Sequence, residues 1–172
     1  MKKMLLVAFM LVITVINAFG QQAAVFQIDG KALRGYDVIA YYNEEKPVRG
    51  HDSLSFQWNN STWLFSSPDN LKLFRQNPEK YAPQYGGYCA YGIAGGYKAP
   101  TQPDAWAIVN GKLYFNYNRK VKASWDKDQA GYIGKADTNW QLIKDKKSQF
   151  SLNLANTGFL LHLKNEVPNI SN

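Results

Sequence analysis

The chain has 172 residues, of which 45% are hydrophobic, 15% aromatic and only 19% charged, and its formal net charge is +7. This length suggests one domain with a small appendage, and the composition excludes a disordered chain, a coiled coil and collagen. Cysteine occurs once, as Cys89, which excludes a disulfide within the chain. The methionines all lie in the first ten residues and the histidines are His51 and His162, so soft metal ligands are scarce.

The N-terminus has the pattern of a signal peptide. Lys2 and Lys3 precede an apolar run over residues 4–16, and small residues near Gly20 fit a cleavage after it. We therefore predict a signal peptide over residues 1–20 and an exported protein, periplasmic or secreted; an uncleaved anchor is the alternative. The run is shorter than the roughly 20 residues of a spanning helix, so no stable membrane span is expected after cleavage. Cleavage removes two lysines and no acids, which lowers the charge from +7 to +5, and an exported, mildly basic chain is not expected to bind nucleic acid.

Alternating residues and turn residues predict strands in the first part of the domain. Leu54, Phe56 and Trp58 alternate with polar residues, which is typical of a half-buried strand. Asn59-Asn60 supplies the positive φ angles of a tight hairpin turn. The predicted elements are a strand at 23–28, helical turns at 38–42, a strand around 54–58 and a returning strand at 62–65.

Helix signals follow this hairpin. Ser67 offers a capping hydroxyl and Pro68 stands at the first helical position, so a helix is predicted there. A second short helix is expected from Pro78. A glycine pair then precedes residues 88–94, which we expect to be helical, and this would place Cys89 in the first turn of that helix.

A second hairpin is the clearest local prediction. Residues 105–109 and 112–116 flank Asn110-Gly111, the strongest short turn signal. Beyond it, a helix capped near Asn118 and a final helix over 133–143 are expected, with Trp140 facing inward. The order of strands and helices predicts an α+β domain with two antiparallel β-hairpins and several short helices. From Asp145 onward the pattern changes, and residues 146–172 are predicted to be a C-terminal extension, either a strand pair or a tail.

An ordered series of motifs resembles the exported bacterial YHS domain-containing (seleno)protein family. The resemblance covers about residues 23–141. The matching residues are Gly35-Tyr36-Asp37, Phe56, Trp63, Asn77-Pro78-Glu79-Lys80-Tyr81, Ala82-Pro83-Gln84-Tyr85-Gly86-Gly87-Tyr88-Cys89-Ala90-Tyr91, Trp106, Asn110-Gly111-Lys112-Leu113-Tyr114, Asn116-Tyr117-Asn118 and Trp125.

The resemblance implies a small YHS-like α+β domain over residues 21–145. YHS domains occur in copper-transporting ATPases and beside metal-dependent oxygenases, so the resemblance also implies metal binding. This chain lacks the several cysteines that would build a metal cluster in such relatives. Cys89 is the position that corresponds to the selenocysteine of some members.

Cys89 and His51 are the candidate metal ligands. A thiolate at a helix start is favoured by the helix dipole, and it would bind a soft metal or enter redox chemistry. Cys89 and His51 make half of a tetrahedral zinc site, which Asp37, Asp52, Asp104 or a second subunit would complete. The metal is left open between copper and zinc. A buried core cysteine and a surface histidine are the alternatives.

Aromatic residues with polar tips suit a ligand pocket or a partner surface, and an aromatic core is the alternative. The predicted ligand-binding residues are Tyr36, Asp37, Tyr85, Tyr88, Tyr91 and Trp106.

These patterns predict an exported binding domain for a metal ion or small molecule near Cys89. The alternatives are a thiol redox protein that uses Cys89, and a non-catalytic module that presents aromatics or the C-terminal extension to a protein partner. The sequence contains no nucleophile elbow, phosphate-binding glycine loop or metalloprotease helix, so a conventional enzyme is not expected.

Overall fold

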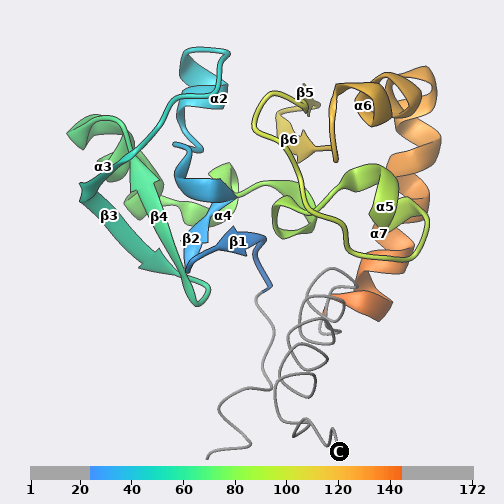
Figure 1. Ribbon diagram of the computed structural model, residues 1–172, viewed down its shortest axis with the longest axis horizontal. Coiled ribbons are helices and arrows are strands. Elements are labelled where there is room, and N and C mark those ends of the chain that lie inside the picture. The colour runs from blue at the N-terminus through green and yellow to red at the C-terminus, as the bar shows by residue number, and fades with distance from the viewer. Residues whose placement is uncertain (1–23, 145–172) are drawn as a thin grey trace, which may run out of the picture.

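A computed structural model describes residues 24–144, which form helices and two β-sheets (Figure 1). The α+β class and both predicted antiparallel hairpins are confirmed. The predicted signal peptide at 1–20 and the predicted extension at 146–172 lie outside the described residues.

The first sheet has four strands in the order β1-β2-β4-β3. Its two hairpins are antiparallel, whereas β2 runs parallel to β4. Asn59 and Asn60 join β3 to β4 with φ angles of 51° and 56°, as their short polar side chains predict. The strands are β1 (Gln27–Ile28), β2 (Lys31–Ala32), β3 (His51–Trp58) and β4 (Ser61–Phe65). The first strand is therefore shorter in the structure, at Gln27–Ile28, than the predicted strand at residues 23–28.

Three helices accompany this sheet: α2 (Ala40–Asn43), α3 (Pro68–Gln76) and α4 (Pro78–Tyr81). The predicted start of α3 is confirmed, because the Ser67 hydroxyl accepts the backbone N–H of Asn70 at 3.2 Å. Phe74 of α3 is fully buried against the sheet, where its ring lies 4.9 Å from that of Trp63. The polar cap and the buried face together fix α3 across one face of the sheet.

The second half contains a two-stranded sheet and three helices. They are α5 (Ala90–Ala94), β5 (Trp106–Val109), β6 (Lys112–Phe115), α6 (Arg119–Trp125) and α7 (Gln129–Ile143). The Asn118 side chain accepts the N–H of Val121 at 2.9 Å, which confirms the predicted cap of α6. Helix α7 begins at Gln129 rather than at 133, because the Asp128 carboxylate accepts the N–H of Gly131 at 2.9 Å and caps it earlier.

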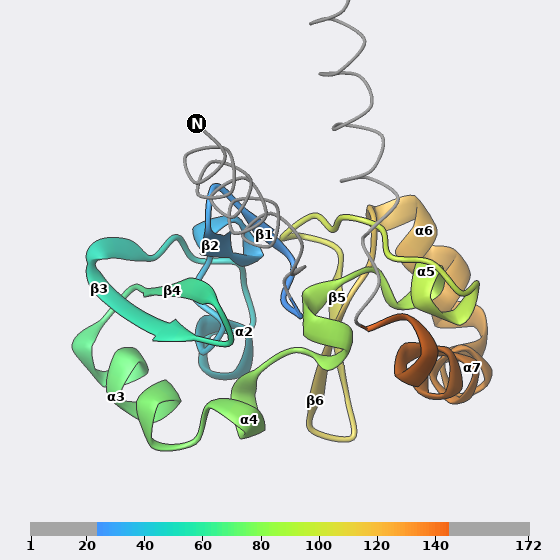
Figure 2. The same cartoon turned by 90° about the horizontal axis from the view of Figure 1, so that it is seen from below.

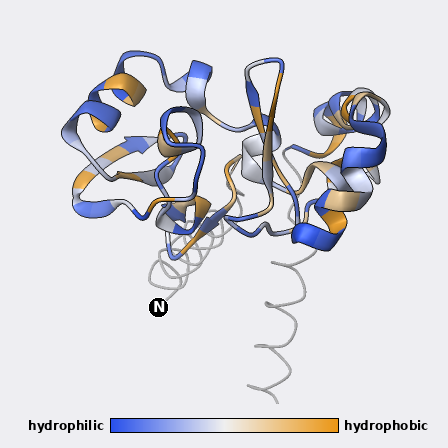
Figure 3. Ribbon diagram, turned by 90° about the horizontal axis from the view of Figure 1, so that it is seen from above, coloured by the Kyte–Doolittle hydropathy of each residue, from blue (hydrophilic) through white to orange (hydrophobic). Residues whose placement is uncertain are grey.

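Strand β6 lies between two hydrophobic clusters. Leu113 and Phe115 belong to the first cluster, with the four-stranded sheet, α2 and α3, whereas Tyr114 belongs to the second, with α5, α6 and α7. Successive side chains of a strand point to opposite faces, so one strand serves both clusters. Figure 2 shows β5 and β6 between the two groups of elements. Figure 3 shows hydrophobic and hydrophilic residues interspersed along the helices, as expected when each buries one face.

Within residues 24–144, no helix has the length and apolar character needed to cross a membrane.

Candidate functional site

Cys89 is the N-cap of α5 and not part of its first turn, because the helix begins at Ala90. Its sulfur accepts the backbone N–H of Gly92 at 3.4 Å and that of Tyr117 at 3.2 Å. The thiol also lies 3.7 Å from the Asn116 side-chain oxygen, to which it donates. Only 2% of Cys89 is exposed. The side chain therefore joins the start of α5 to the chain just after β6.

Burial raises the pKa of the Cys89 thiol above its ordinary value. The backbone N–H groups of Gly92 and Tyr117 act in the opposite direction, because they stabilise a thiolate, but burial prevails. Cys89 therefore carries a neutral, enclosed thiol at pH 7. This differs from the lowered pKa that we expected for a thiol at a helix start.

His51, the second predicted metal ligand, stands on β3 with an exposed side chain. Two of the acids that would complete a site pair with cations instead, Asp52 with Lys31 at 2.6 Å and Asp104 with Arg119 at 2.8 Å. In the part of the chain from 24 to 144, no three His, Cys, Asp or Glu side chains gather as metal ligands would.

Asp37 is fully buried, and its carboxyl group accepts four hydrogen bonds. One oxygen accepts the Ile39 N–H at 2.8 Å. The other accepts the Ser66 N–H at 2.8 Å, the Ser66 hydroxyl at 2.7 Å and the Asn70 amide at 2.8 Å. The group is thus engaged in joining the turn before α2 to the start of α3, which is a structural role.

Tyr36 and Trp106 are both half-buried at the first hydrophobic cluster. The Arg49 guanidinium lies 4.4 Å above the Tyr36 ring. Trp106 of β5 meets Tyr41 edge to face, with ring centres 5.2 Å apart. Each aromatic thus has a packing partner within the protein.

Tyr88 and Tyr91 belong to the second cluster. Tyr88 is buried, and burial raises the pKa of its phenol to about 12. The Lys98 ammonium lies 5.0 Å from the Tyr88 ring. Tyr91 packs against Tyr132, with ring centres 4.9 Å apart. Tyr88 and Tyr91 therefore pack as part of the aromatic core.

Tyr85 adopts a left-handed conformation, with φ 55°, and Gly86 and Gly87 continue it with φ 61° and 82°. A positive φ is unusual for a tyrosine, because its Cβ disfavours the left-handed region. Its hydroxyl donates to the Asp137 carboxylate of α7 at 2.8 Å. Burial, followed by this neighbouring carboxylate, raises the pKa of Tyr85. The turn and this hydrogen bond thereby fix Tyr85 in the second cluster, against α7.

A cleft of about 300 Å³ lies between the two clusters. Trp63 and Val25 come from the first cluster, whereas Tyr85 comes from the second. The apolar lining of the cleft also contains the partly exposed rings of Trp58 and Trp140, together with Ala82 and Pro83.

The rim of the cleft is polar. Gln84 and Asn59 offer hydrogen-bonding groups, and Glu79 and Lys144 carry opposite charges. Ala24 also lines the cleft, so the two ends of the described chain meet there. An aromatic floor with a few polar groups at the rim is the usual composition of a small-molecule site.

Of the eight predicted site residues, Tyr85 is the one that lines this cleft. The other seven lie elsewhere. His51 is exposed on β3, and the remaining six have the packing and hydrogen-bonding roles described above. Sequence reasoning missed Trp58, Trp63 and Trp140 as site residues. The sequence placed Trp58 on a half-buried strand, Trp63 in a motif of the resemblance and Trp140 on the inward face of a helix. The one signal that could have found them is the presence of five tryptophans in the chain.

Comparisons with models of known protein families, with curated proteins and with solved structures found no match to this chain.

Proposed function

We propose that this chain is a small binding domain that holds a flat aromatic molecule in the cleft between its two hydrophobic clusters. The observation that carries the proposal is the convergence of Trp58, Trp63 and Trp140 with Tyr85 around about 300 Å³ of space. Ligand pockets typically measure roughly 300 to 1,000 Å³, so the cleft suits a ligand at the small end of that range.

The lining indicates the chemistry of this ligand. Indole rings bind apolar and aromatic faces well, in stacked or edge-to-face arrangements. Gln84 and Asn59 at the rim would accept or donate hydrogen bonds to a polar edge of the ligand. Glu79 and Lys144 are both present, so the charges there give no preference for an anion or a cation.

This proposal keeps the small-molecule form of the predicted function and moves the site from Cys89 to Tyr85, which stands four residues earlier in the chain. The cleft that Tyr85 lines supports this location. Binding of copper or zinc stays a prediction that rests on the resemblance. We also propose, on the motifs and the N-terminal pattern alone, that the chain is an exported YHS-like protein. A mature mass that lacks residues 1–20 would test the export.

The binding test uses 8-anilinonaphthalene-1-sulfonate, a fluorescent aromatic sulfonate whose naphthalene ring is flat, titrated into the folded protein. We expect saturable binding at one site, with energy transfer from the tryptophans of the cleft. Trp58→Leu and Trp140→Leu each remove one ring from the lining. Each should weaken binding by about tenfold, because a lost aromatic contact costs on the order of 1 kcal/mol or more.

Trp106→Leu is the matched control. It removes the same side chain from a half-buried position outside the lining of the cleft. It should leave probe affinity unchanged, with urea unfolding curves confirming that all three variants are folded. Equal binding by all three variants, or no saturable binding by the unaltered protein, would refute the proposed site.

A further inference from the structure

The outer edge of β3 is available for pairing. β3 ends the sheet order β1-β2-β4-β3 and is hydrogen-bonded to β4 on one side; no other strand of residues 24–144 joins its other side. Antiparallel pairing is regular from Ser55 to Trp58, whereas the register is irregular between His51 and Ser55. The regular part of the strand, Ser55 to Trp58, contains no proline and no charged residue, the kinds of residue that commonly block a strand edge.

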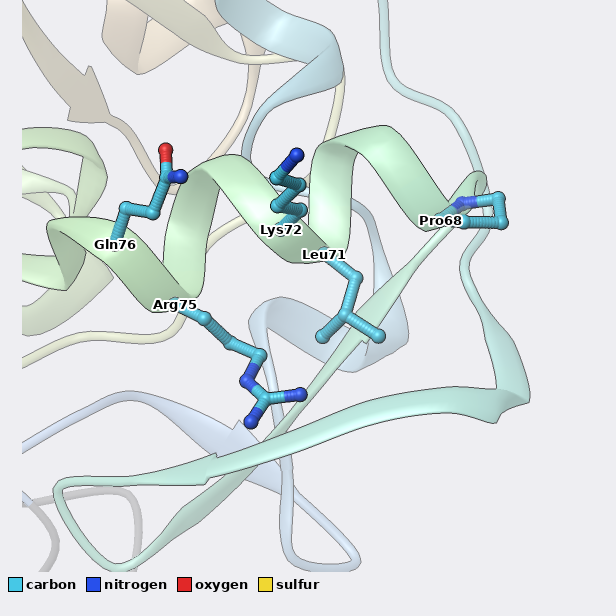
Figure 4. Close-up of a pocket in the computed structure, with 5 residues that line it drawn as sticks. All are labelled: Pro68, Leu71, Lys72, Arg75 and Gln76. Atoms are coloured by element: carbon cyan, nitrogen blue, oxygen red, sulfur yellow. The ribbon is translucent and has the colours of Figure 1, made fainter.

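A groove lies on one face of α3, the helix that packs against the same sheet. It has a volume of about 300 Å³ and is lined by Pro68, Leu71, Lys72, Arg75 and Gln76 of α3. These residues recur with helical spacing and so form one face of α3. Figure 4 shows Leu71 and Arg75 pointing from the helix toward the β3–β4 hairpin.

Arg75 connects the groove to β3. Its guanidinium lies 5.6 Å from the centre of the Phe56 ring, and Phe56 is a β3 residue in the regular part of the strand. Side chains of a strand that adds to β3 would point, at every second residue, to the face of the sheet that α3 covers. The groove is thus placed to receive a side chain of an added strand.

The groove also selects the chemistry of that strand. Leu71 and Pro68 are apolar, whereas Lys72 and Arg75 are exposed cations, and the lining contains no acid. A carboxylate on the added strand would complement these cations. A second copy of this chain would instead bring the same two cations against each other, which disfavours self-pairing.

We propose that the outer edge of β3 and the Leu71–Arg75 face of α3 form a docking site for an extended acidic peptide segment. The segment adds as a further strand through backbone hydrogen bonds, inserts one apolar side chain beside Leu71 and places a carboxylate at Arg75, the cation that points toward the hairpin. This mode of recognition takes affinity from the main chain and specificity from alternate side chains. It is independent of the aromatic cleft.

The test uses a blocked peptide of about six residues, Val-Thr-Asp-Thr-Val-Thr, titrated into the isotope-labelled full chain. Its valine and aspartate stand two residues apart, so both side chains point to the face of the sheet that α3 covers. We expect resonance shifts and slowed amide exchange confined to β3 and α3. The same peptide N-methylated at alternate residues keeps its side chains but loses backbone donors, so it should fail to bind. A lysine-for-aspartate peptide should also fail.

Protein variants provide the second arm. Arg75→Gln should weaken the aspartate peptide about tenfold, because it removes a charge-assisted partner. Lys127→Gln removes an exposed cation from a distant turn and should have no effect. Trp140→Leu, which alters the cleft, should also leave peptide affinity unchanged.

Each contrary outcome overturns the proposal. Absence of binding by the aspartate peptide refutes the docking site. Equal binding by the N-methylated peptide refutes strand addition, and equal binding by the lysine peptide refutes the acidic specificity. Unchanged affinity in Arg75→Gln refutes the role of α3. If only Trp140→Leu loses peptide binding, the peptide binds in the cleft and not at β3.

Discussion

The Asp37 carboxyl group accepts a hydrogen bond of 2.8 Å from the side-chain amide of Asn70, and both residues are buried. Asp37 lies just before α2, whereas Asn70 lies in the first turn of α3, so one contact joins segments 33 residues apart. The Ser66 hydroxyl donates to the same carboxyl oxygen at 2.7 Å and accepts a hydrogen bond of 3.3 Å from the Asn70 amide. The acid that the sequence suggested as a ligand contact is the centre of a buried structural network.

Asp37→Ala should therefore destabilise the protein strongly. The substitution leaves the N–H groups of Ile39 and Ser66 and the Asn70 amide without their acceptor in a buried region. We expect a loss of about 3 kcal/mol or more in the free energy of unfolding, measured by urea denaturation. Asp52→Ala removes an exposed carboxylate that pairs with Lys31 and should cost no more than about 1 kcal/mol. Equal costs would contradict the structural role of Asp37.

Gly86 is a second position where the fold constrains the residue type. Its φ is +61°, and a Cβ atom there would collide with the Ala24 carbonyl. The Gly86 carbonyl meanwhile accepts the Phe26 N–H at 2.8 Å, so the Ala24–Phe26 segment cannot move away without losing that bond.

Gly86→Ala should cost about 3 kcal/mol or more, because left-handed strain and a backbone collision act together. Gly96→Ala is the control. Gly96 also has positive φ but open space around it, so strain alone applies and about 1 kcal/mol is expected. Gly86→Ala should also weaken binding of the fluorescent probe, since Gly86 and Ala24 both line the cleft. If the two variants lose similar amounts of unfolding free energy, the collision at Gly86 does not add to the cost of left-handed strain.

The local elements were largely predictable from the sequence because their signals are local. Asn59-Asn60 and Asn110-Gly111 close the two hairpins with positive φ, and Ser67 and Asn118 cap their helices as expected. Each of these depends on the conformational preference of one or two residues. The parallel pairing of β2 with β4 was not predicted, because it joins strands distant in the sequence.

The site was predicted poorly for the same physical reason. Trp58, Trp63 and Trp140 come from separate elements, and no spacing in the sequence reveals that they converge. Cys89 followed a correct local rule, being next to a helix start, but its burial depends on the chain after β6, which packs over it. Burial is a tertiary property, so the rule for an exposed helix end gave the wrong direction for the thiol pKa.

The Cys89 thiol should be protected in the folded protein. At pH 8 we expect labelling by iodoacetamide to be at least about 100-fold slower than in urea, because reaction requires an opening of about 3 kcal/mol or more. Ser53→Cys in a Cys89→Ala background places one thiol on an exposed position of β3 and should label rapidly. Rapid, stoichiometric labelling of folded wild-type protein would instead favour the thiol redox alternative.

Stability should fall in alkaline solution, beginning with Cys89. Burial raises its pKa in the folded state, and burial likewise raises the pKa of Tyr88 to about 12. Unfolded thiols and phenols titrate near about 8.5 and 10. The folded protein therefore holds protons that the unfolded chain releases, so the stability these groups contribute is fully present below the unfolded pKa values and is lost as the pH rises toward the folded ones.

Urea unfolding between pH 7 and pH 11 measures this loss. Each buried group should contribute up to about 1.4 kcal/mol per pH unit within its window. Cys89→Ala should remove the part of the slope that begins near about pH 8.5, and Tyr88→Phe should reduce the part above about pH 10. An unfolding free energy that stays constant through pH 11, or slopes that neither variant alters, would contradict the burial of these two side chains, because an exposed group titrates alike in both states and adds no pH dependence.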